Sequence, residues 1–257
     1  MRFQTAHTPN SLTEGPIAQT LIAFALPLFL GNLFQQLYNT ADSLIVGNFL
    51  GSEALAAVSS SGNLIFLMVG LVNGISMGAG VVIARYFGAK DYDRMQKTIH
   101  TLLAFGLVAG ALLTVIGMTL SPVMLRLMDT PEEVMTYATT YIRIYFAGMI
   151  PSLIYNIGSG ILRAVGDSKR PLYFLICACL VNIVLDIVLV LYANMGVAGA
   201  ALATIFSQAV SALLVILALL HATPALRLHW RKIRLHGDLL PRIIRIGLPT
   251  GIQNMVI

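Results

Sequence analysis

Charged residues are scarce in this sequence of 257 residues. Asp, Glu, Lys and Arg together make up only 11% of it, whereas an average soluble domain carries about 25%. Hydrophobic residues account for 57%, and the mean hydropathy is +0.83. This balance excludes an ordinary soluble domain and predicts an integral membrane protein.

Residues that bind metals or form disulfides are also few. Cys177 and Cys179 are the only cysteines, and two positions apart on a helix they point to nearly opposite sides. None of the five histidines has a second one four residues away, the spacing that places two metal ligands on one helix face. We therefore expect no disulfide, no transition-metal site and no cofactor.

Two signatures of other functional classes are missing too. The zinc-protease pattern HExxH and the phosphate-binding pattern GxxxxGK[ST] do not occur, so energy for any transport would have to come from an ion gradient. The formal net charge of +5 could suggest nucleic acid, but the basic residues fall between apolar segments rather than along one polar face. We expect neither an enzyme nor a nucleic-acid-binding protein.

Long apolar segments dominate the chain. Six of them exceed the roughly 20 residues that cross a 30 Å hydrocarbon core, and a seventh starts near residue 239. The fold class predicted is all-α, a polytopic membrane bundle of six transmembrane helices plus the start of a seventh. The six lie at approximately residues 17–42, 54–84, 99–124, 134–161, 171–192 and 196–220.

Basic residues concentrate in alternate connections between these segments. By the positive-inside rule these connections and the N-terminus are predicted to be cytoplasmic, in a multi-pass protein of the cell membrane. The chain then divides into a cytoplasmic segment at 1–16, a six-helix lobe at 17–221, a cytoplasmic linker at 222–238 and the start of a second lobe at 239–257. The residues concerned are Arg85, Lys90, Arg94, Lys97, Arg163, Lys169, Arg170, Arg227, Arg231, Lys232 and Arg234.

The first apolar segment carries polar groups that a lipid-facing helix would not tolerate. Gln35, Tyr38 or Asn39, and Asp42 recur at helical spacing and are predicted to share one face. Ionisable residues inside membrane spans are costly, and they usually face a bundle interior or an ion route. Pro27 lies in the middle of the segment and is predicted to bend the helix.

A second group of polar residues lies in the last two complete segments. Asn182 and Asp186 are four residues apart and stack on one helix face, and the next segment adds Thr204 and Gln208. At a rise of 1.5 Å per residue, Asn182, Asp186 and Thr204 come out about 16, 22 and 18 Å above the cytoplasmic face. We expect the three to meet at one membrane level.

Oxygen ligands without sulfur or imidazole suit a hard cation, Na⁺ or H⁺. Two carboxylates in a low-dielectric bundle stay ionised beside a cation, or one takes up a proton, and either behaviour couples to an ion. The competing interpretation is an inert polar patch that joins helices, which is common for Asn and Thr but rare for Asp. Tyr141 and Tyr145 are weaker candidates, and Arg143 either snorkels or neutralises an aspartate.

The end of the chain repeats its beginning. At an offset of 222, Gly15 aligns with Gly237, and the pairs Leu26/Leu248, Pro27/Pro249 and Asn32/Asn254 also match. Six crossings return the chain to its original side, so the repeat is parallel, as in transporters built from two like bundles. We therefore expect this sequence to hold the first half of a two-lobe, twelve-helix protein whose C-terminal lobe is missing here.

Several motifs together resemble one family, the multidrug and toxic compound extrusion (MATE) transporters. They are P-x7-Q-x6-D from Pro27, the stretch VGNFLGSEALAA, the connections RYFGAKD and LRAVGDSKRP, and N-x3-D from Asn182. The resemblance implies an antiporter that exports cationic or amphipathic compounds against Na⁺ or H⁺. It implies a cation site at Asp42, Asn182, Asp186 and Thr204, where Na⁺ could bind, with Gln35 in the hydrogen-bond network; Tyr38, Asn39 and Gln208 are further candidates for that network.

Two alternatives remain open at this point. A flippase for lipid-linked oligosaccharide or polysaccharide precursors would share the bundle, but it should line its cleft with several cationic side chains. Arg143 is the only plausible cation within a span. The second alternative is a membrane protein without transport activity.

Overall fold

Residues 17–256 form a bundle of helices, and no strand occurs in this range. The computed structural model describes these residues, apart from the side chains at 67, 68, 71–73 and 254–256. The predicted cytoplasmic segment at 1–16, including Gly15 of the internal repeat, lies outside the described residues. The predicted all-α class is confirmed.

The helices follow the predicted apolar segments, although most extend beyond them. α1 runs to Leu50 rather than to residue 42, because the polar residues near Asp42 remain helical. The order is α1 (Ile17–Leu50), α2 (Ser52–Gly88), α3 (Tyr92–Leu127), α4 (Glu132–Ala147), α5 (Met149–Ala164), α6 (Lys169–Asp186), the π-helix η1 (Ile187–Tyr192), α7 (Gly196–Leu220), the 3₁₀-helix η2 (Trp230–Lys232) and α8 (Leu240–Val256).

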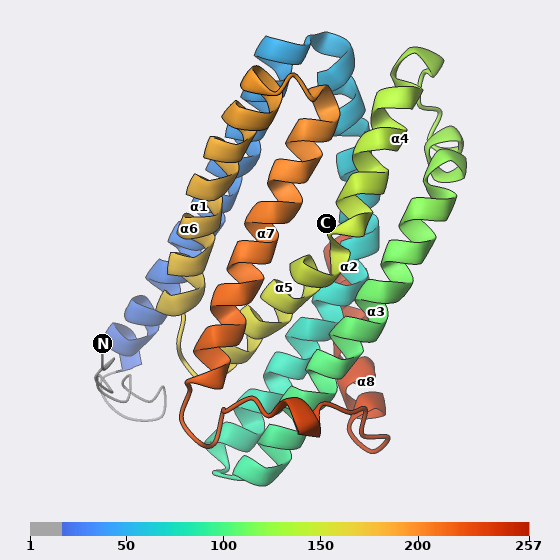
Figure 1. Ribbon diagram of the computed structural model, residues 1–257. Helices are drawn as coiled ribbons and strands as arrows, with labels where there is room; N and C mark the ends of the chain where they lie inside the picture. Colours follow the sequence, from blue (N-terminus) through green and yellow to red (C-terminus); the bar gives the residue numbers. More distant parts are fainter. Residues whose placement is uncertain (1–16, 257) are drawn as a thin grey trace.

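The bundle has two edges joined by a common core. α1 and α6 lie side by side at one edge, with α7 next to α6, and α3 packs with α4 at the other edge (Figure 1). α2 and α5 contact each other and α3 between these edges. Their shared core includes Ile83, Met95, Ile157 and Val215, all with an exposed fraction of 0%. This core supports the α6–α7 pair against which α1 packs.

The fourth predicted segment, 134–161, is not one straight helix. It divides at Gly148 into α4 and α5, which are bent by 54° relative to each other. Pro151 lies in the first turn of α5 and has no N–H to continue a helix from Ala147, so the break precedes it. A side chain at Gly148 would overlap Ile205 of α7, so the bend also lets α7 approach closely.

α1 is continuous through Pro27, which is buried. Figure 1 shows the helix running along the whole edge of the bundle without a break. The bend predicted at this proline therefore stays a prediction.

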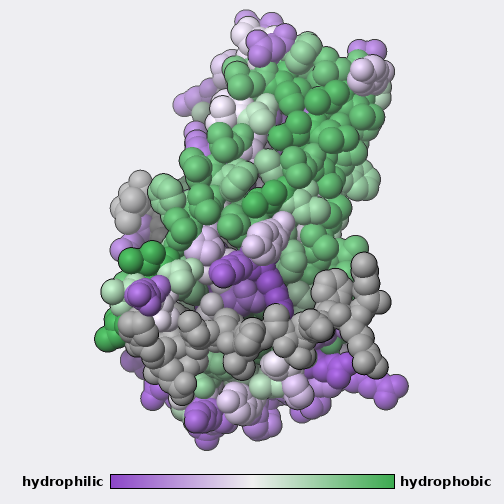
Figure 2. Space-filling view, turned by 90° about the vertical axis from the view of Figure 1, so that its left-hand side faces the viewer, coloured by the Kyte–Doolittle hydropathy of each residue, from purple (hydrophilic) through white to green (hydrophobic). Residues whose placement is uncertain are grey.

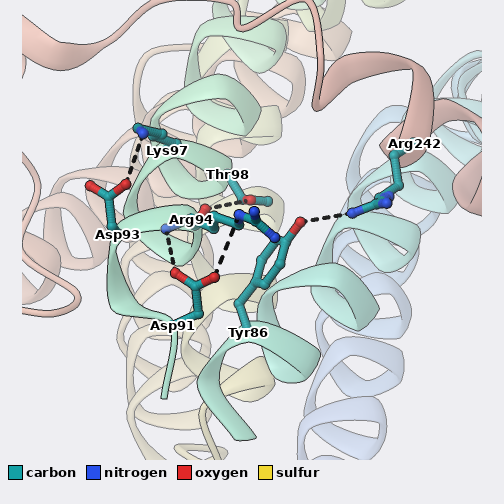
Figure 3. Close-up of polar contacts among 7 residues, drawn as sticks. All are labelled: Tyr86, Asp91, Asp93, Arg94, Lys97, Thr98 and Arg242. Atoms are coloured by element: carbon teal, nitrogen blue, oxygen red, sulfur yellow. Dashed lines mark hydrogen bonds and ion pairs between the residues drawn. The ribbon is translucent and has the colours of Figure 1, made fainter. Parts of the chain in front are cut away.

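The start of the predicted second lobe packs on α2. Side chains at Gly74 and Gly78 of α2 would overlap the backbones of Gly251 and Gly247 of α8, so the two helices approach at backbone distance. Both pairs have the four-residue spacing of a membrane helix contact between small residues. Arg242 of α8 adds a 2.9 Å hydrogen bond from its guanidinium to the Tyr86 hydroxyl (Figure 3).

Several helices are suited to a membrane. Among the described residues, α1, α3, α6 with η1, and α7 are long and apolar enough to cross one, and the bent α4–α5 pair counts as a fifth. The predicted count of six plus one stays a prediction. Figure 2 shows a continuous hydrophobic surface over the upper part of one face, with hydrophilic groups at both ends of the molecule.

Two acidic residues at the start of α3 are paired locally, at the end of the bundle where the basic connections lie (the basic end). The Asp93 carboxylate lies 2.7 Å from the Lys97 ammonium (Figure 3). The Asp91 carboxylate accepts a hydrogen bond from the Arg94 backbone N–H, and it also forms an ion pair with the Arg94 guanidinium at 3.5 Å. Asp91 also precedes the first residue of α3 as its N-cap. These exposed pairs begin the helix and point to no site.

Candidate cation site

Three helices bring the predicted cation-site residues into the interior of the bundle. Asp42 lies in α1, Asn182 and Asp186 lie in α6, and Thr204 lies in α7. The exposed fractions are 7% for Asp42, 0% for Asn182 and Asp186, and 4% for Thr204. Because α1 packs against both α6 and α7, these side chains are enclosed between the three helices.

The carboxyl groups of Asp42 and Asp186 are neighbours across the contact between α1 and α6. The ion pairs of the described residues all lie at the basic end, so neither carboxylate has a cationic partner within residues 17–256. Two ionised carboxylates that are buried together repel each other, and their loss of hydration is uncompensated. The pair therefore requires either a proton or a bound cation.

Unsatisfied polar atoms gather around this pair. Oδ1 of Asp42, both carboxylate oxygens of Asp186, and Oδ1 and Nδ2 of Asn182 are buried without a hydrogen-bond partner. The Tyr38 hydroxyl has none either. Buried polar groups in native proteins are nearly always paired, so such a concentration calls for an explanation. Five of the six atoms are oxygens, and oxygens are the ligands that a hard cation prefers.

Tyr38 connects the aspartates to α7. Its ring lies one turn before Asp42, and its hydroxyl lies beside Thr204 and Ser207. The Thr204 hydroxyl donates to the Ala200 carbonyl at 3.1 Å, and the Ser207 hydroxyl donates to the Thr204 carbonyl at 2.8 Å. Both hydroxyl oxygens therefore keep acceptor capacity toward the cluster. The network role predicted for Tyr38 stays a prediction.

Tyr141 belongs to the cluster although sequence reasoning ranked it as a weak candidate. It lies in α4, is buried, and has Asp42, Tyr38 and Asp186 as neighbours. Its ring stacks on Tyr145 at a centroid distance of 6.3 Å, and Tyr145 in turn lies beside Gln208. The sequence shows a tyrosine hydroxyl on an otherwise apolar face of α4. The spacing of residues along α4 did not show which other helix that face contacts.

Other predicted residues lie away from the buried cluster. Gln35 and Asn39 are exposed, whereas Tyr38 and Asp42 of the same helix are buried. Gln35 shares a helix face with Asp42, but a shared face does not make every residue on it buried. The Arg143 side chain is exposed and forms no ion pair with a described aspartate, which contradicts the idea that it neutralises one.

The exposed polar residues of α1 form a groove of their own. It has a volume of about 310 Å³ and is lined by Gln36, Asn39, Thr40, Ser43, Leu44 and Leu55. A transmembrane helix with such a face cannot turn it toward lipid without cost. The groove therefore marks a surface that meets water or another polar protein surface.

A π-helix follows the second aspartate directly. Asp186 is the last residue of α6, and η1 continues from Ile187 to Tyr192. Such segments are rare and frequently lie at functional sites, where they change the direction of neighbouring side chains. A Cβ atom at Gly199 would meet the Leu189 backbone at 3.1 Å, so the start of α7 packs tightly on η1. No sequence signal predicted this irregularity.

The residue types in the cluster suit the binding of a hard cation or a proton. The described residues contain no group of three or more His, Cys, Asp or Glu side chains that could hold a transition metal. The pentapeptide Gly74–Gly78 matches the hydrolase pattern GxSxG, but it lies within the continuous helix α2 and not at a strand-to-helix turn. An exchangeable cation or proton between Asp42 and Asp186 is the chemistry that fits.

Comparison with known proteins gives consistent matches. The family model MatE matches residues 27–188. The sequence is 34% identical over 246 residues to the probable multidrug resistance protein YoeA of Bacillus subtilis (strain 168), covering 93% of this chain and 53% of that protein. The chain thus spans about half the length of the curated relative.

Two solved structures of similar proteins differ in conformation. One is described as the outward-facing conformation of a multidrug resistance MATE family transporter of the MOP superfamily, with a TM-score of 0.88, 28% identity, and 97% of this chain and 55% of that one covered. The structure described as inward-facing has a TM-score of 0.79, 29% identity, and 90% and 54% coverage. The present fold is more similar to the outward-facing one.

Proposed function

Because this chain belongs to the MatE family of membrane transporters, we propose that it forms one half of a cation-coupled antiporter. The complete transporter exports cationic or amphipathic organic compounds against an inward gradient of Na⁺ or H⁺. A second six-helix half is the required partner. The basic connections and the N-terminus face the cytoplasm, and the protein resides in the cell membrane.

One observation carries this proposal: Asp42 and Asp186 are buried next to each other without a cationic partner among the described residues. A cation or proton held between them neutralises the pair, and its release restores the repulsion. Since α1 contributes one carboxylate and α6 the other, occupancy changes how strongly these helices attract each other. That differential interaction is what an ion needs in order to shift a conformational equilibrium.

The substrate route is assigned to the exposed polar face of α1. Gln36, Asn39, Thr40 and Ser43 lie on this face, and Asp42 lies at its buried side. In two-lobe transporters with a parallel repeat, the substrate passes between the halves while one rocks against the other. A half that presents a polar groove next to its ion site has the parts that such a mechanism needs.

The flippase alternative lacks its expected chemistry. Recognition of a pyrophosphate would need several cationic side chains facing the route. The groove on α1 is lined by uncharged residues, and the Arg143 side chain is exposed. An organic cation, in contrast, would be attracted by an acidic interior.

The decisive experiment measures efflux by a transporter that contains both halves. Asp42→Asn and Asp186→Asn should each reduce ion-coupled efflux to the level of cells without the transporter, because an amide keeps the size of the carboxylate but cannot titrate. Asp129→Asn is the matched control, since Asp129 is exposed in the α3–α4 connection and should leave efflux unchanged. Normal efflux from either buried variant, at normal membrane abundance, would refute ion coupling at this site.

The coupling ion requires a separate measurement in vesicles. Transport that follows an imposed sodium gradient at clamped pH identifies Na⁺. Transport that follows only a pH gradient identifies H⁺. Both outcomes are compatible with a site of carboxylate, amide and hydroxyl groups.

A further inference from the structure

A second pocket lies on the opposite side of α7 from the aspartates, near the basic end of the bundle. It has a volume of about 300 Å³ and is lined by apolar side chains of α3, α5, α7 and the connection at residues 221–239. They include Leu107, Ile154, Leu213, Leu228, Trp230 and Ile233. Leu107, Leu213 and Trp230 are at the same time exposed, so the pocket opens outward.

Hydrogen bonds fix the connection that covers this pocket. The Gln96 amide donates to the Pro224 carbonyl at 2.6 Å, and the Leu228 backbone donates to the Leu219 carbonyl at 3.1 Å. The His229 backbone N–H donates to Nε2 of His100 at 3.1 Å. With Leu228 only 3% exposed and packed into the main core, the wall that the connection builds is part of the fold.

Exposed basic residues flank Leu228, Trp230 and Ile233 of the pocket lining in the sequence, and we refer to them as its rim. Arg227, Arg231, Lys232 and Arg234 are all exposed, whereas Asp238 is the only acidic residue between 221 and 239. Elsewhere at this end Arg94, Lys97 and Arg170 form ion pairs with nearby aspartates. None of the four rim residues appears in an ion pair of the described chain. Arg227 donates a hydrogen bond to the Leu220 carbonyl and Arg234 donates one to Nε2 of His236, so Arg231 and Lys232 are the residues whose charge is most available to a ligand.

The combination identifies the chemistry of the ligand. The apolar lining is complementary to a flexible hydrocarbon chain, and the basic rim is complementary to a negative charge attached to the end of that chain. Trp230, at the junction of the two, is the residue type that marks a membrane–water interface. Basic residues close to a membrane surface attract anionic lipids.

We propose that this pocket is a binding site for one anionic phospholipid, with an acyl chain between α3, α5 and α7 and the phosphate held by Arg231 and its basic neighbours. The site is separate from the aspartate pair, and its occupancy does not require transport. The same lipid would contact both η2 and the pocket-lining side chains of α3 and α7. It would therefore hold η2 against these helices, in the connection between α7 and α8.

The chain supplies its own reporter, because Trp230 is its only tryptophan. The purified chain would be placed in vesicles or nanodiscs that contain phosphatidylcholine with either brominated phosphatidylglycerol or brominated phosphatidylcholine. Bromine quenches tryptophan fluorescence at short range. Phosphatidylglycerol should quench Trp230 at a several-fold lower mole fraction than phosphatidylcholine does, and unlabelled phosphatidylglycerol should reverse the quenching.

Two variants distinguish recognition of the lipid headgroup charge from binding of the acyl chain in the pocket. Arg231→Gln should reduce the preference for phosphatidylglycerol about fivefold, the usual contribution of one basic residue near an anionic surface. Ala209→Phe places a ring into the pocket lining and should weaken quenching by both lipids. Arg126→Gln, which removes an exposed charge at the end of α3 far from the linker, is the control and should change neither.

The wild-type measurement alone can overturn the proposal. Equal quenching by the two brominated lipids at all mole fractions would show an apolar groove without headgroup recognition. Preference that survives in Arg231→Gln and in Lys232→Gln would place the anionic lipid elsewhere. Circular dichroism and the tryptophan emission maximum verify that each variant is folded, and loss of efflux plays no part in the readout.

Discussion

The carboxylates of Asp42 and Asp186 are buried and lack hydrogen-bond partners at three of their four oxygens, whereas those of Asp91 and Asp93 are paired, Asp91 being half-buried and Asp93 exposed. The first pair lies between α1 and α6, and the second begins α3 beside the α2–α8 contact (Figure 3). The same residue type thus has opposite surroundings in two regions of one bundle.

The difference distinguishes a polar group that serves function from one that serves local structure. Exposed ion pairs contribute little to stability, and they are found where helices start and end. A buried carboxylate without a partner lowers stability, and it persists when the protein uses its charge. We infer that the α2–α8 region is stabilised by packing, and that the aspartate region gives up stability for ion binding. Three substitutions test this comparison.

The largest effect is expected where helices touch at backbone distance. Gly78→Leu places a side chain into the Gly247 backbone and should lower the free energy of unfolding by about 3 kcal/mol. Gly80→Leu is the matched control, because nothing lies within 4 Å of a Cβ atom at that position of the same helix. Thermal unfolding in detergent measures both. Equal loss in the two variants would show that the α2–α8 contact does not contribute.

An intermediate effect of opposite sign is expected in the aspartate region. Asn182→Leu removes two buried, unpaired atoms and should raise the free energy of unfolding by about 1–3 kcal/mol in cation-free buffer. Added sodium or protons should then stabilise the variant less than they stabilise the wild type.

Asn156→Leu provides the comparison for this variant. The Asn156 amide donates to the Ser152 carbonyl at 2.9 Å, so its removal breaks an existing hydrogen bond and should destabilise the protein. If Asn182→Leu is as destabilising as Asn156→Leu in cation-free buffer, the amide of Asn182 has a protein partner, and its assignment to an ion site fails.

The smallest effect belongs to the exposed ion pair. Asp93→Asn removes the 2.7 Å contact with Lys97, but both side chains are well exposed to solvent, and the unfolding midpoint should not change measurably. The same comparison at low and high salt should also show no difference. A large shift would mean that the basic end depends on its charges, which would remove the contrast between the two regions.

Composition and spacing determined much about this protein. Length and hydropathy of the apolar segments predicted α1, α3, α6 and α7 to within several residues of most of their ends. Asp42 and Asp186 were singled out because placing a carboxylate in hydrocarbon costs free energy, so an aspartate in such a segment usually has a function. These properties depend on the local sequence and on the solvent, and both can be judged without knowing which helices are neighbours.

Tertiary structure decided which side chains meet. Helical spacing gave Gln35 and Asp42 the same direction around α1, yet Gln35 is exposed and Asp42 is buried next to Asp186 of α6. Tyr141 of α4 lies near the aspartates in a bundle where α4 and α5 are bent by 54° at Gly148, and Gly148 leaves room for Ile205 of α7. Periodicity specifies direction around one helix axis. Whether another helix, lipid or water lies in that direction depends on packing between segments that are distant in the sequence.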